Sequence, residues 1–415
     1  MRIAFTFTLG LALVGSLAAC DTFVEDVDIP IDRVASDSLD EQGSVVFLAT
    51  GVKEGFNDAY DVTALLSDLL SDAGQFNNCV SGSTFPTYGD IDRGEIRPDN
   101  NSVDGAYNAI SEYRFLADDL LRRADETITF SDDAEGAEAE RLARYTALFH
   151  GGVARYFLAT YMALNPTEGG APINRSAFIP SSELYSEAID LLDQSKAFAA
   201  SDYDERVVNS VIARIYLFQG DLDQAADFAA DGLMEGDAPY FGRYASTSQN
   251  EWHAQGGIGR TQVTVNARFA DGDPRTPVAA AGAASGGCAA LGPYYRQALY
   301  ESADAAIPFI TWQEMALIQA EAALEDDDEE GALGFANAAR ASYGLDDLDA
   351  FDQATLISER DKTLFTQGLR LIDQRRFGLD FTYVIPQTDG TVAPLPGAWR
   401  YLPLTQSERN ANTNL

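Results

Sequence analysis

Apolar residues recur at intervals of three and four along most of the chain, which is the spacing of one face of an α-helix. This pattern predicts about ten helices separated by polar turns. The chain is therefore expected to adopt a mostly α-helical fold with minor β structure. The predicted helices cover residues 38–60, 61–73, 102–124, 134–163, 181–199, 205–218, 222–235, 312–324, 329–343 and 357–378.

Four of these helices form two pairs with the pattern of helical hairpins. Residues 205–218 and 222–235 are separated by only three residues, and small and aromatic side chains are spaced so that two antiparallel helices can pack closely. Residues 312–324 and 329–343 repeat this plan across an acidic turn. Two such units in one chain predict a tetratricopeptide-like scaffold of helical hairpins.

The last predicted helix, residues 357–378, combines an apolar face with a regular series of charges. Gly368 lies in the middle of the apolar face, where a glycine costs about 1 kcal/mol relative to alanine and so indicates close packing. Arg370, Asp373 and Arg376 are three residues apart, which lets one carboxylate lie between two guanidinium groups. No nucleophile accompanies them, so we interpret these charges as a structural brace.

Two long insertions, residues 75–101 and 237–307, interrupt the helical pattern and are the expected binding regions. Their aromatic residues argue against disorder, and aromatic faces beside amides and an arginine suit sugars, although a peptide could use the same groups. Each aromatic residue could instead pack its loop onto the helices. The candidate ligand-binding residues are Trp252, His253, Phe85, Tyr88, Tyr295, Arg296 and Asn78.

The N-terminus has the pattern of a lipoprotein signal peptide. One early cation, Arg2, precedes an apolar run that is too short to span a membrane, and small residues then lead to Cys20. The pattern predicts a signal peptide over residues 1–19, lipidation of Cys20, an acidic tether over 20–40 and a helical domain over 41–415. More than one fatty-acyl chain, such as palmitate, would make this anchor stable. An ordinary secretory signal with an incidental cysteine is the alternative.

The net charge excludes one class of partner. The chain has 65 acidic and 28 basic residues, a formal net charge of -37 and a pI near 4.1. Phosphate groups would be repelled by such a surface, so we expect no nucleic-acid partner. The acidic surface is typical of proteins from saline habitats, although it bears on solubility more than on activity.

Cysteine and histidine usage limits the chemistry further. Cys79 and Cys288 lie in polar loops of an exported chain, where they could form a disulfide or remain two thiols. Histidine occurs only at positions 150 and 253, and no catalytic or metal-binding motif is present. We therefore expect a protein that is not an enzyme and uses no metal or cofactor. A surface glycosidase is the remote alternative, because two carboxylates suffice for that reaction.

Residues 357–378, ISERDKTLFTQGLRLIDQRRFG, resemble the C-terminal signature of the SusD/RagB family of nutrient-binding outer-membrane lipoproteins. That signature is usually close to ER-x3-L-x-F/L-E-G-x-R-x2-D-x-R-R-[WF]-G, and this chain departs from it at Gln367, where glutamate is common. Shorter matches follow in the family's order, including GGAPI at 169–173, DPR at 273–275 and the closing segment 401–415. The resemblance thus covers nearly all of the mature chain.

The resemblance implies a SusD-like protein at the cell surface, anchored to the outer membrane by its lipid. Such a protein binds an oligomeric nutrient, most often a glycan and in some members a peptide, and delivers it to a TonB-dependent SusC-like barrel. The helices would face the barrel, and the loops would carry the ligand. A scaffold that uses its helical repeats only to dock proteins is the alternative. The family's signature residues here are Glu359, Arg360, Gly368, Arg370, Asp373 and Arg376.

Overall fold

The computed structural model describes residues 36–77, 84–281, 294–384, 392–395 and 397–415. Cys20, Asn78, Cys79, Cys288 and most of the tether lie outside these residues, so their predicted roles stay predictions. The described chain is mostly helical, as the sequence predicts. Its α-helices are α3 (Val45–Leu70), α4 (Pro86–Asp92), α5 (Asn101–Glu126), α6 (Ala134–Tyr161), α7 (Ser181–Ser195), α8 (Asp202–Gln219), α9 (Leu222–Ala230), α10 (Glu251–Gly256), α11 (Trp312–Glu325), α12 (Glu329–Ala341), α13 (Gln353–Thr363), α14 (Arg370–Arg376) and α15 (Gln406–Ala411).

Short 3-10 helices and strands complete the fold. The 3-10 helices are η1 (Ser36–Leu39), η2 (Gln42–Ser44), η3 (Lys196–Phe198) and η4 (Ala267–Phe269). The strands are β1 (Gly74–Phe76), β2 (Met162–Asn165), β3 (Glu168–Ala171), β4 (Ile179–Pro180), β5 (Tyr240–Gly242), β6 (Val263–Val265), β7 (Val278–Ala280), β8 (Tyr295–Gln297), β9 (Ile307–Ile310), β10 (Thr382–Val384), β11 (Val392–Pro394) and β12 (Leu402–Pro403).

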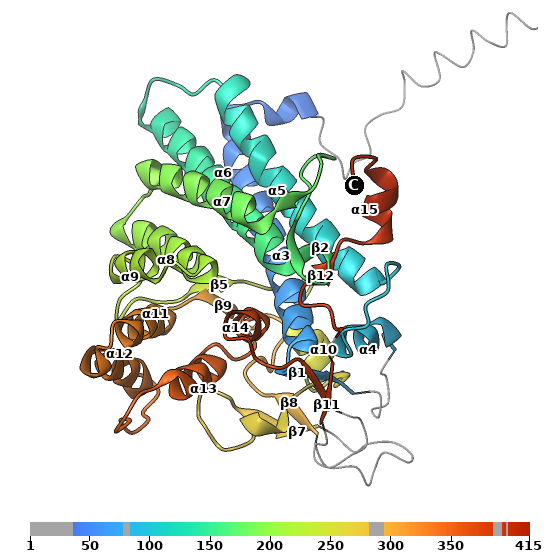
Figure 1. The fold of residues 1–415 in the computed structure, drawn as a ribbon. Helices are drawn as coiled ribbons and strands as arrows, with labels where there is room; N and C mark the ends of the chain where they lie inside the picture. Colours follow the sequence, from blue (N-terminus) through green and yellow to red (C-terminus); the bar gives the residue numbers. More distant parts are fainter. Residues whose placement is uncertain (1–35, 78–83, 282–293, 385–391, 396) are drawn as a thin grey trace, which may run out of the picture.

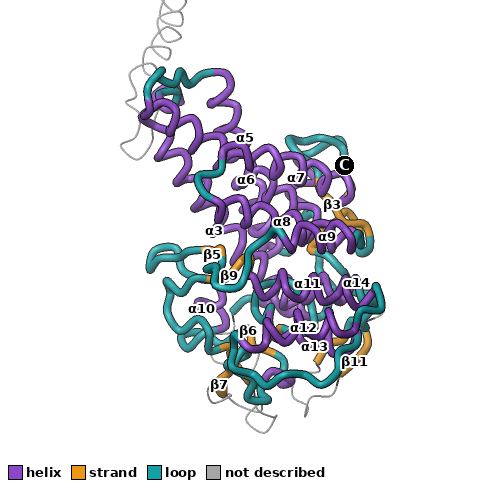
Figure 2. The backbone as a smooth tube through the Cα atoms, turned by 90° about the vertical axis from the view of Figure 1, so that its left-hand side faces the viewer, coloured by secondary structure: helices purple, strands orange, loops and turns teal. Residues whose placement is uncertain are grey.

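The large helices pack in a continuous series. α3 packs on α5 and α6, α6 on α7, and the series continues through α8 and α9 to α11 and α12. Figure 2 shows the same series from the side, with the loop-rich insertions beside it. The predicted hairpins, α8 with α9 and α11 with α12, are confirmed. Gly220 closes the first hairpin in a left-handed conformation with φ 81°.

The core of this series is rich in aromatic rings. Phe56 of α3 lies 5.2 Å from Phe309 of β9 and 6.2 Å from Phe157 of α6, measured between ring centroids. His150 is buried in the same layer, where the hydroxyl of Tyr113 lies 2.7 Å from its Nδ1 atom. Burial lowers the pKa of His150 to about 3, so this histidine is a neutral packing residue at physiological pH.

Several predicted helix boundaries are wrong, and the helix predicted over 222–235 ends at Ala230. Residues 38–60 and 61–73 were expected to form separate helices, but α3 continues from Val45 to Leu70. Within this helix the carboxylate of Asp61 accepts hydrogen bonds from the backbone N–H groups of Val62 (2.6 Å) and Glu251 (2.9 Å). Residues 357–378 were expected to form one helix, but the chain turns between α13 and α14. Thr366 (φ 62°) and Gly368 (φ 76°) adopt left-handed conformations there.

The two insertions are built into one antiparallel sheet with the order β1-β6-β8-β7. β1 opens the first insertion, and the other three strands belong to the second. Gly74 pairs with Val265, and Val265 pairs in turn with Tyr295. The sheet lies at the lower end of the molecule in Figure 1, beside α4 and α10. The insertions are therefore a structured platform and not simply loops.

Candidate functional site

The two insertions also meet outside the sheet. The backbone N–H of Asn77 donates to the carbonyl oxygen of Gln262 (2.7 Å), and the N–H of Thr84 donates to the side-chain Oε1 of the same residue (3.2 Å). Gln262 is buried, so these bonds fix the position of the first insertion against the second. Residues almost 180 positions apart therefore contribute to one surface.

This surface carries a group of aromatic and polar side chains, which we call the insertion cluster: Phe85, Tyr88, Glu251, Gln255 and Arg260. The rings of Phe85 and Tyr88 stack with centroids 5.3 Å apart and planes 19° apart. The guanidinium of Arg260 lies over the Phe85 ring, 5.3 Å from its centroid. An aromatic ring next to a cation and an amide is a suitable arrangement for a polyhydroxylated ligand.

The hydrogen bonds that Arg260 forms with described residues are long. Its guanidinium donates to Oε1 of Gln255 (3.4 Å) and to Oγ1 of Thr84 (3.2 Å), and it forms no ion pair with a described carboxylate. Ordinary N–H···O bonds are near 2.9 Å, so these bonds are weak. The hydroxyl groups of a ligand could replace them at small cost.

Glu251 supplies a hydrogen-bond acceptor that lacks a donor. Its Oε2 atom is buried and accepts no hydrogen bond from any residue that the structure describes. Burial raises the pKa of Glu251, whereas a side-chain hydrogen bond with Gln255 and the positive charge of Arg260 lower it. A buried acceptor without a donor costs about 1–3 kcal/mol. A donating hydroxyl group would recover part of this free energy.

α10, the short helix that begins at Glu251, is held at its N-terminal end by Asn250 and Asp61. The side chain of Asn250 accepts from the N–H of His253 (3.1 Å) and donates to the carbonyl oxygen of Ala305 (2.8 Å). Asp61 of α3 accepts from the N–H of Glu251. Burial raises the pKa of Asp61. These hydrogen bonds fix the position of α10 and therefore the position of Glu251.

The structure corrects the predicted role of Trp252. Only 1% of this residue is exposed, and its ring faces the core beneath α10. Tyr88 is also buried, and its ring stacks on that of Phe85. Both are packing residues in this structure, which was the alternative interpretation for aromatic residues in the insertions. Phe85 remains half-buried and is the ligand-facing candidate of the three.

The other predicted binding residues are spread over the platform. Nδ1 of His253 lies 3.2 Å from the carbonyl oxygen of Tyr300. Tyr295 and Arg296 lie on β8, which β6 separates from β1, and Arg296 pairs with Glu301 at 3.2 Å. The structure thus does not gather all the predicted residues around one point.

The sequence reasoning missed Glu251, Gln255 and Arg260. A signal for Arg260 was present in the glycine-rich run Gly256-Gly257-Ile258-Gly259 before it, because glycine clusters mark turns and loops, where binding residues are often found. Ile258 is 63% exposed in the structure and adds an apolar surface next to the cluster.

The signature residues form a buried network of ion pairs. Arg360 pairs with Asp373 through two hydrogen bonds of 2.9 and 3.0 Å, and Asp373 also accepts from Arg376 at 2.9 Å. Arg376 also forms an ion pair with Glu321 of α11. The predicted arrangement is corrected in one respect: the carboxylate of Asp373 lies between Arg360 and Arg376, because the turn before α14 directs Arg370 to Asp72 instead (2.6 Å).

Glu359 and Gly368 connect the same region to distant segments. Glu359 accepts from Arg275 (2.5 Å) and from Arg340 (2.7 Å). The N–H of Gly368 donates to Asp68 of α3 (3.1 Å), and its carbonyl oxygen accepts from the hydroxyl of Ser67 (2.7 Å). Burial raises the pKa of Asp68 to about 8. These contacts hold α3, α13 and the second insertion together.

None of the described helices has a segment long and apolar enough to cross a membrane. Within the described residues, no group of three or more His, Cys, Asp or Glu side chains could hold a metal ion.

Comparison with known proteins identifies the architecture. No protein-family model and no curated protein sequence matches the chain. Among solved structures, a putative sugar binding protein from Bacteroides vulgatus ATCC 8482 is similar with a TM-score of 0.71 and 17% identity, covering 90% of this chain and 97% of that chain.

Two other solved structures agree with it. A laminarin binding SusD-like protein has a TM-score of 0.67 and 14% identity, with 89% of this chain and 97% of that chain covered. The surface glycan-binding protein A from Bacteroides uniformis has a TM-score of 0.64 and 14% identity, with 88% and 98% covered. Similarity at such identities establishes the fold, which confirms the resemblance of residues 357–378 at the level of architecture: the chain has the fold of the SusD superfamily.

Proposed function

We propose that this chain is a cell-surface lipoprotein that captures an oligosaccharide at the insertion cluster. The observation that carries the proposal is the half-buried Phe85 ring beside Arg260, with the unpartnered Oε2 atom of Glu251 close by. A sugar offers C–H faces to the ring and hydroxyl groups to the two polar side chains. The similar structures support a glycan ligand, because their descriptions name sugar, laminarin and surface-glycan binding.

The proposed role is binding without catalysis. A glycosidase needs two carboxylates that are free to act on the substrate. Asp61 of α3 is the carboxylate bonded to the start of α10 beside the cluster, and both of its oxygens accept from backbone N–H groups, at 2.6 and 2.9 Å. Asp61 therefore anchors α10, and Glu251 has no free acidic partner there.

The binding step has a direct test. Phe85→Ala and Arg260→Ala are each expected to lower the affinity for the bound oligosaccharide about ten-fold, which corresponds to ~1.4 kcal/mol, because each removes one contact to the sugar. A panel of soluble oligosaccharides would identify the ligand, and isothermal titration calorimetry would measure the loss. Phe335→Ala is the matched control, since Phe335 is an exposed phenylalanine on α12, away from the platform. Equal affinities for all variants would contradict this site, and no binding to any oligosaccharide would contradict the ligand class.

We further propose delivery of the ligand to a TonB-dependent SusC-like barrel, with Cys20 lipidated and the chain anchored in the outer membrane. Such an anchor would keep the insertion cluster at the cell surface within reach of the barrel. Affinity purification from detergent-solubilised outer membranes is expected to recover a large β-barrel with the full-length chain. Recovery of the chain alone, under conditions that keep its fold, would argue against the delivery step.

A further inference from the structure

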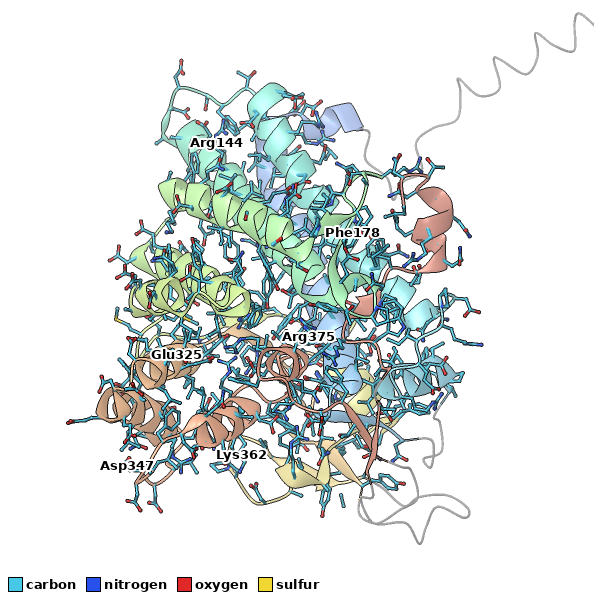
Figure 3. The ribbon with its side chains drawn as sticks, in the orientation of Figure 1. Arg144, Phe178, Glu325, Asp347, Lys362 and Arg375 are labelled. Atoms are coloured by element: carbon cyan, nitrogen blue, oxygen red, sulfur yellow. The ribbon has the colours of Figure 1, made fainter. Side chains whose placement is uncertain are left out.

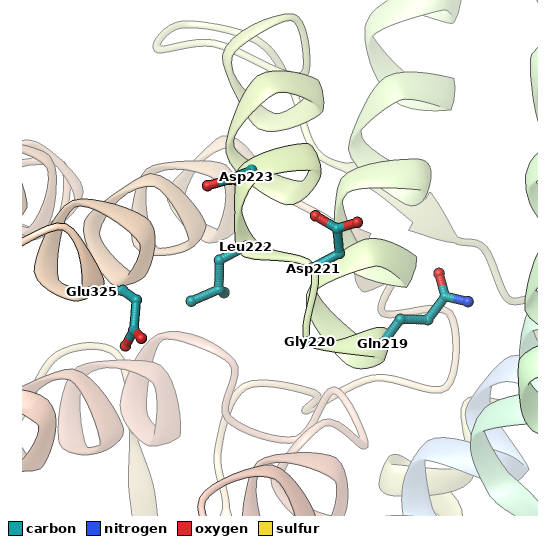
Figure 4. A pocket seen from close by; sticks show the side chains of 6 residues that line it. All are labelled: Gln219, Gly220, Asp221, Leu222, Asp223 and Glu325. Atoms are coloured by element: carbon teal, nitrogen blue, oxygen red, sulfur yellow. The ribbon is translucent and has the colours of Figure 1, made fainter.

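A cleft separate from the insertion cluster lies where α7, the end of α8, α14 and the segment before β12 meet. Its volume is about 470 Å³. Figure 3 labels Arg375 at this junction. A second hollow shares Phe218, Gln219 and Arg376 with it, and a third, shown in Figure 4, continues from Gln219 along the α8–α9 turn to Glu325. The first cleft, which we call the α7–α14 cleft, is lined among others by Ser181, Ser182, Tyr185, Phe218, Arg375 and Tyr401.

Arg375 brings a positive charge without a carboxylate to this cleft. Its guanidinium donates to the carbonyl oxygens of Arg400 (2.7 Å) and Thr160 (2.8 Å) and forms no ion pair with a described carboxylate. The adjacent Arg376, in contrast, pairs with both Asp373 and Glu321. Arg375 therefore brings to the cleft a charge that no described carboxylate pairs with, whereas the charge of Arg376 is already paired.

The surroundings of Arg375 compensate its charge only in part. Thr160 lies in the last turn of α6, where the helix dipole supplies roughly half a negative charge. Burial holds the pKa of Arg375 below its usual range, whereas nearby carboxylates raise the pKa of arginines such as Arg370 and Arg214 against the effect of burial. An anion in the cleft would complete the compensation.

The start of α7 adds to the attraction for an anion. Pro180 precedes the helix and supplies no side-chain hydrogen bond to the first-turn N–H groups. Ser181 and Ser182 of this turn line the cleft. A helix N-terminus carries a partial positive charge, which Glu183 in the same turn offsets in part, so α7 adds less to the attraction for an anion than Arg375 does.

The remaining walls are aromatic. The guanidinium of Arg375 lies 3.9 Å from the centroid of the Tyr401 ring, and Tyr185 and Phe218 line the same cleft. Such rings favour a ligand with a ring-sized apolar body. We infer that the α7–α14 cleft binds a small organic carboxylate that carries a ring, with its carboxylate at Arg375 and its ring against Tyr401 and Phe218. A uronic acid and the terminal carboxylate of an aromatic peptide residue share this chemistry.

The test measures the binding of two carboxylate ligands and one neutral sugar, and then repeats it with a variant that adds a negative charge to the cleft. Calorimetry on the whole mature chain would compare glucuronate, N-acetylphenylalanine and glucose at roughly millimolar concentration. At least one of the two carboxylates is expected to bind, and glucose is not. Binding of glucuronate would indicate a uronic acid as the ligand, and binding of N-acetylphenylalanine would indicate the C-terminus of a peptide.

Ser182→Asp is expected to weaken this binding at least ten-fold, because the new carboxylate repels the ligand's own. An aspartate in the first turn favours the helix, so the melting temperature should not fall. Gln194→Glu is the charge-matched control, since it places the same added charge near the far end of α7. Failure of both carboxylates to bind, or equal binding by the Ser182→Asp variant, would overturn the inference. Binding at the insertion cluster would be unaffected by either result.

Discussion

Replacing Asp373 with alanine is expected to lower the free energy of unfolding by about 3–5 kcal/mol. Asp373 is 3% exposed and is the carboxylate that both Arg360 and Arg376 share. Burial alone would raise the pKa of Asp373, but the two guanidinium groups hold it below its usual range. Among the described residues Arg360 forms an ion pair with Asp373 alone, so removing the carboxylate leaves this buried arginine without an ion-pair partner.

Urea denaturation of the purified mature chain would measure this loss, with Glu138→Ala as the control. Glu138 pairs with Arg141 on the exposed surface of α6, and such pairs contribute about 0–1 kcal/mol. The affinity of folded Asp373→Ala for oligosaccharide should stay close to that of the unmodified protein, because the ion-pair network lies outside the insertion cluster. Similar losses of stability in the two variants would contradict the structural role of Asp373.

The helical scaffold was predictable because its signals are local. The hairpin α8–α9 follows from an apolar period and from Gly220, which ends the first helix in a conformation that favours glycine. The turn between α13 and α14 was not predictable, since Thr366 adopts φ 62° although the apolar spacing continues through it. That turn depends on packing against α3, and the spacing of residues 357–378 does not indicate this contact.

The candidate site was predictable only in outline. Long insertions rich in aromatic residues indicated where binding would occur, but the ring that faces outward depends on the short helix α10. That helix directs Trp252 into the core and leaves Arg260 in the following turn over Phe85. Phe85 and Arg260 are far apart in sequence, so the local sequence pattern could not reveal their contact.

Gly368→Ala is the second substitution with a large expected effect, roughly 2–5 kcal/mol of lost stability. Gly368 has φ 76°, a conformation that costs other residues about 1–2 kcal/mol. An added Cβ would also lie 2.6 Å from the Cα atom of Ala64 in α3. That neighbour is backbone within a buried helix and cannot move aside cheaply, so an overpacking cost of about 1–3 kcal/mol is added.

Gly220→Ala separates these two contributions. Gly220 has φ 81°, but a Cβ added there would meet no heavy atom within 4 Å, so only the conformational cost of about 1–2 kcal/mol applies. Urea denaturation of both variants should therefore show the larger loss for Gly368→Ala, because close contact with α3 is the difference between the two sites. Equal losses would mean that α14 can shift away from α3 without cost. The close contact at Gly368 would then not be required to hold the ion-pair network against α3.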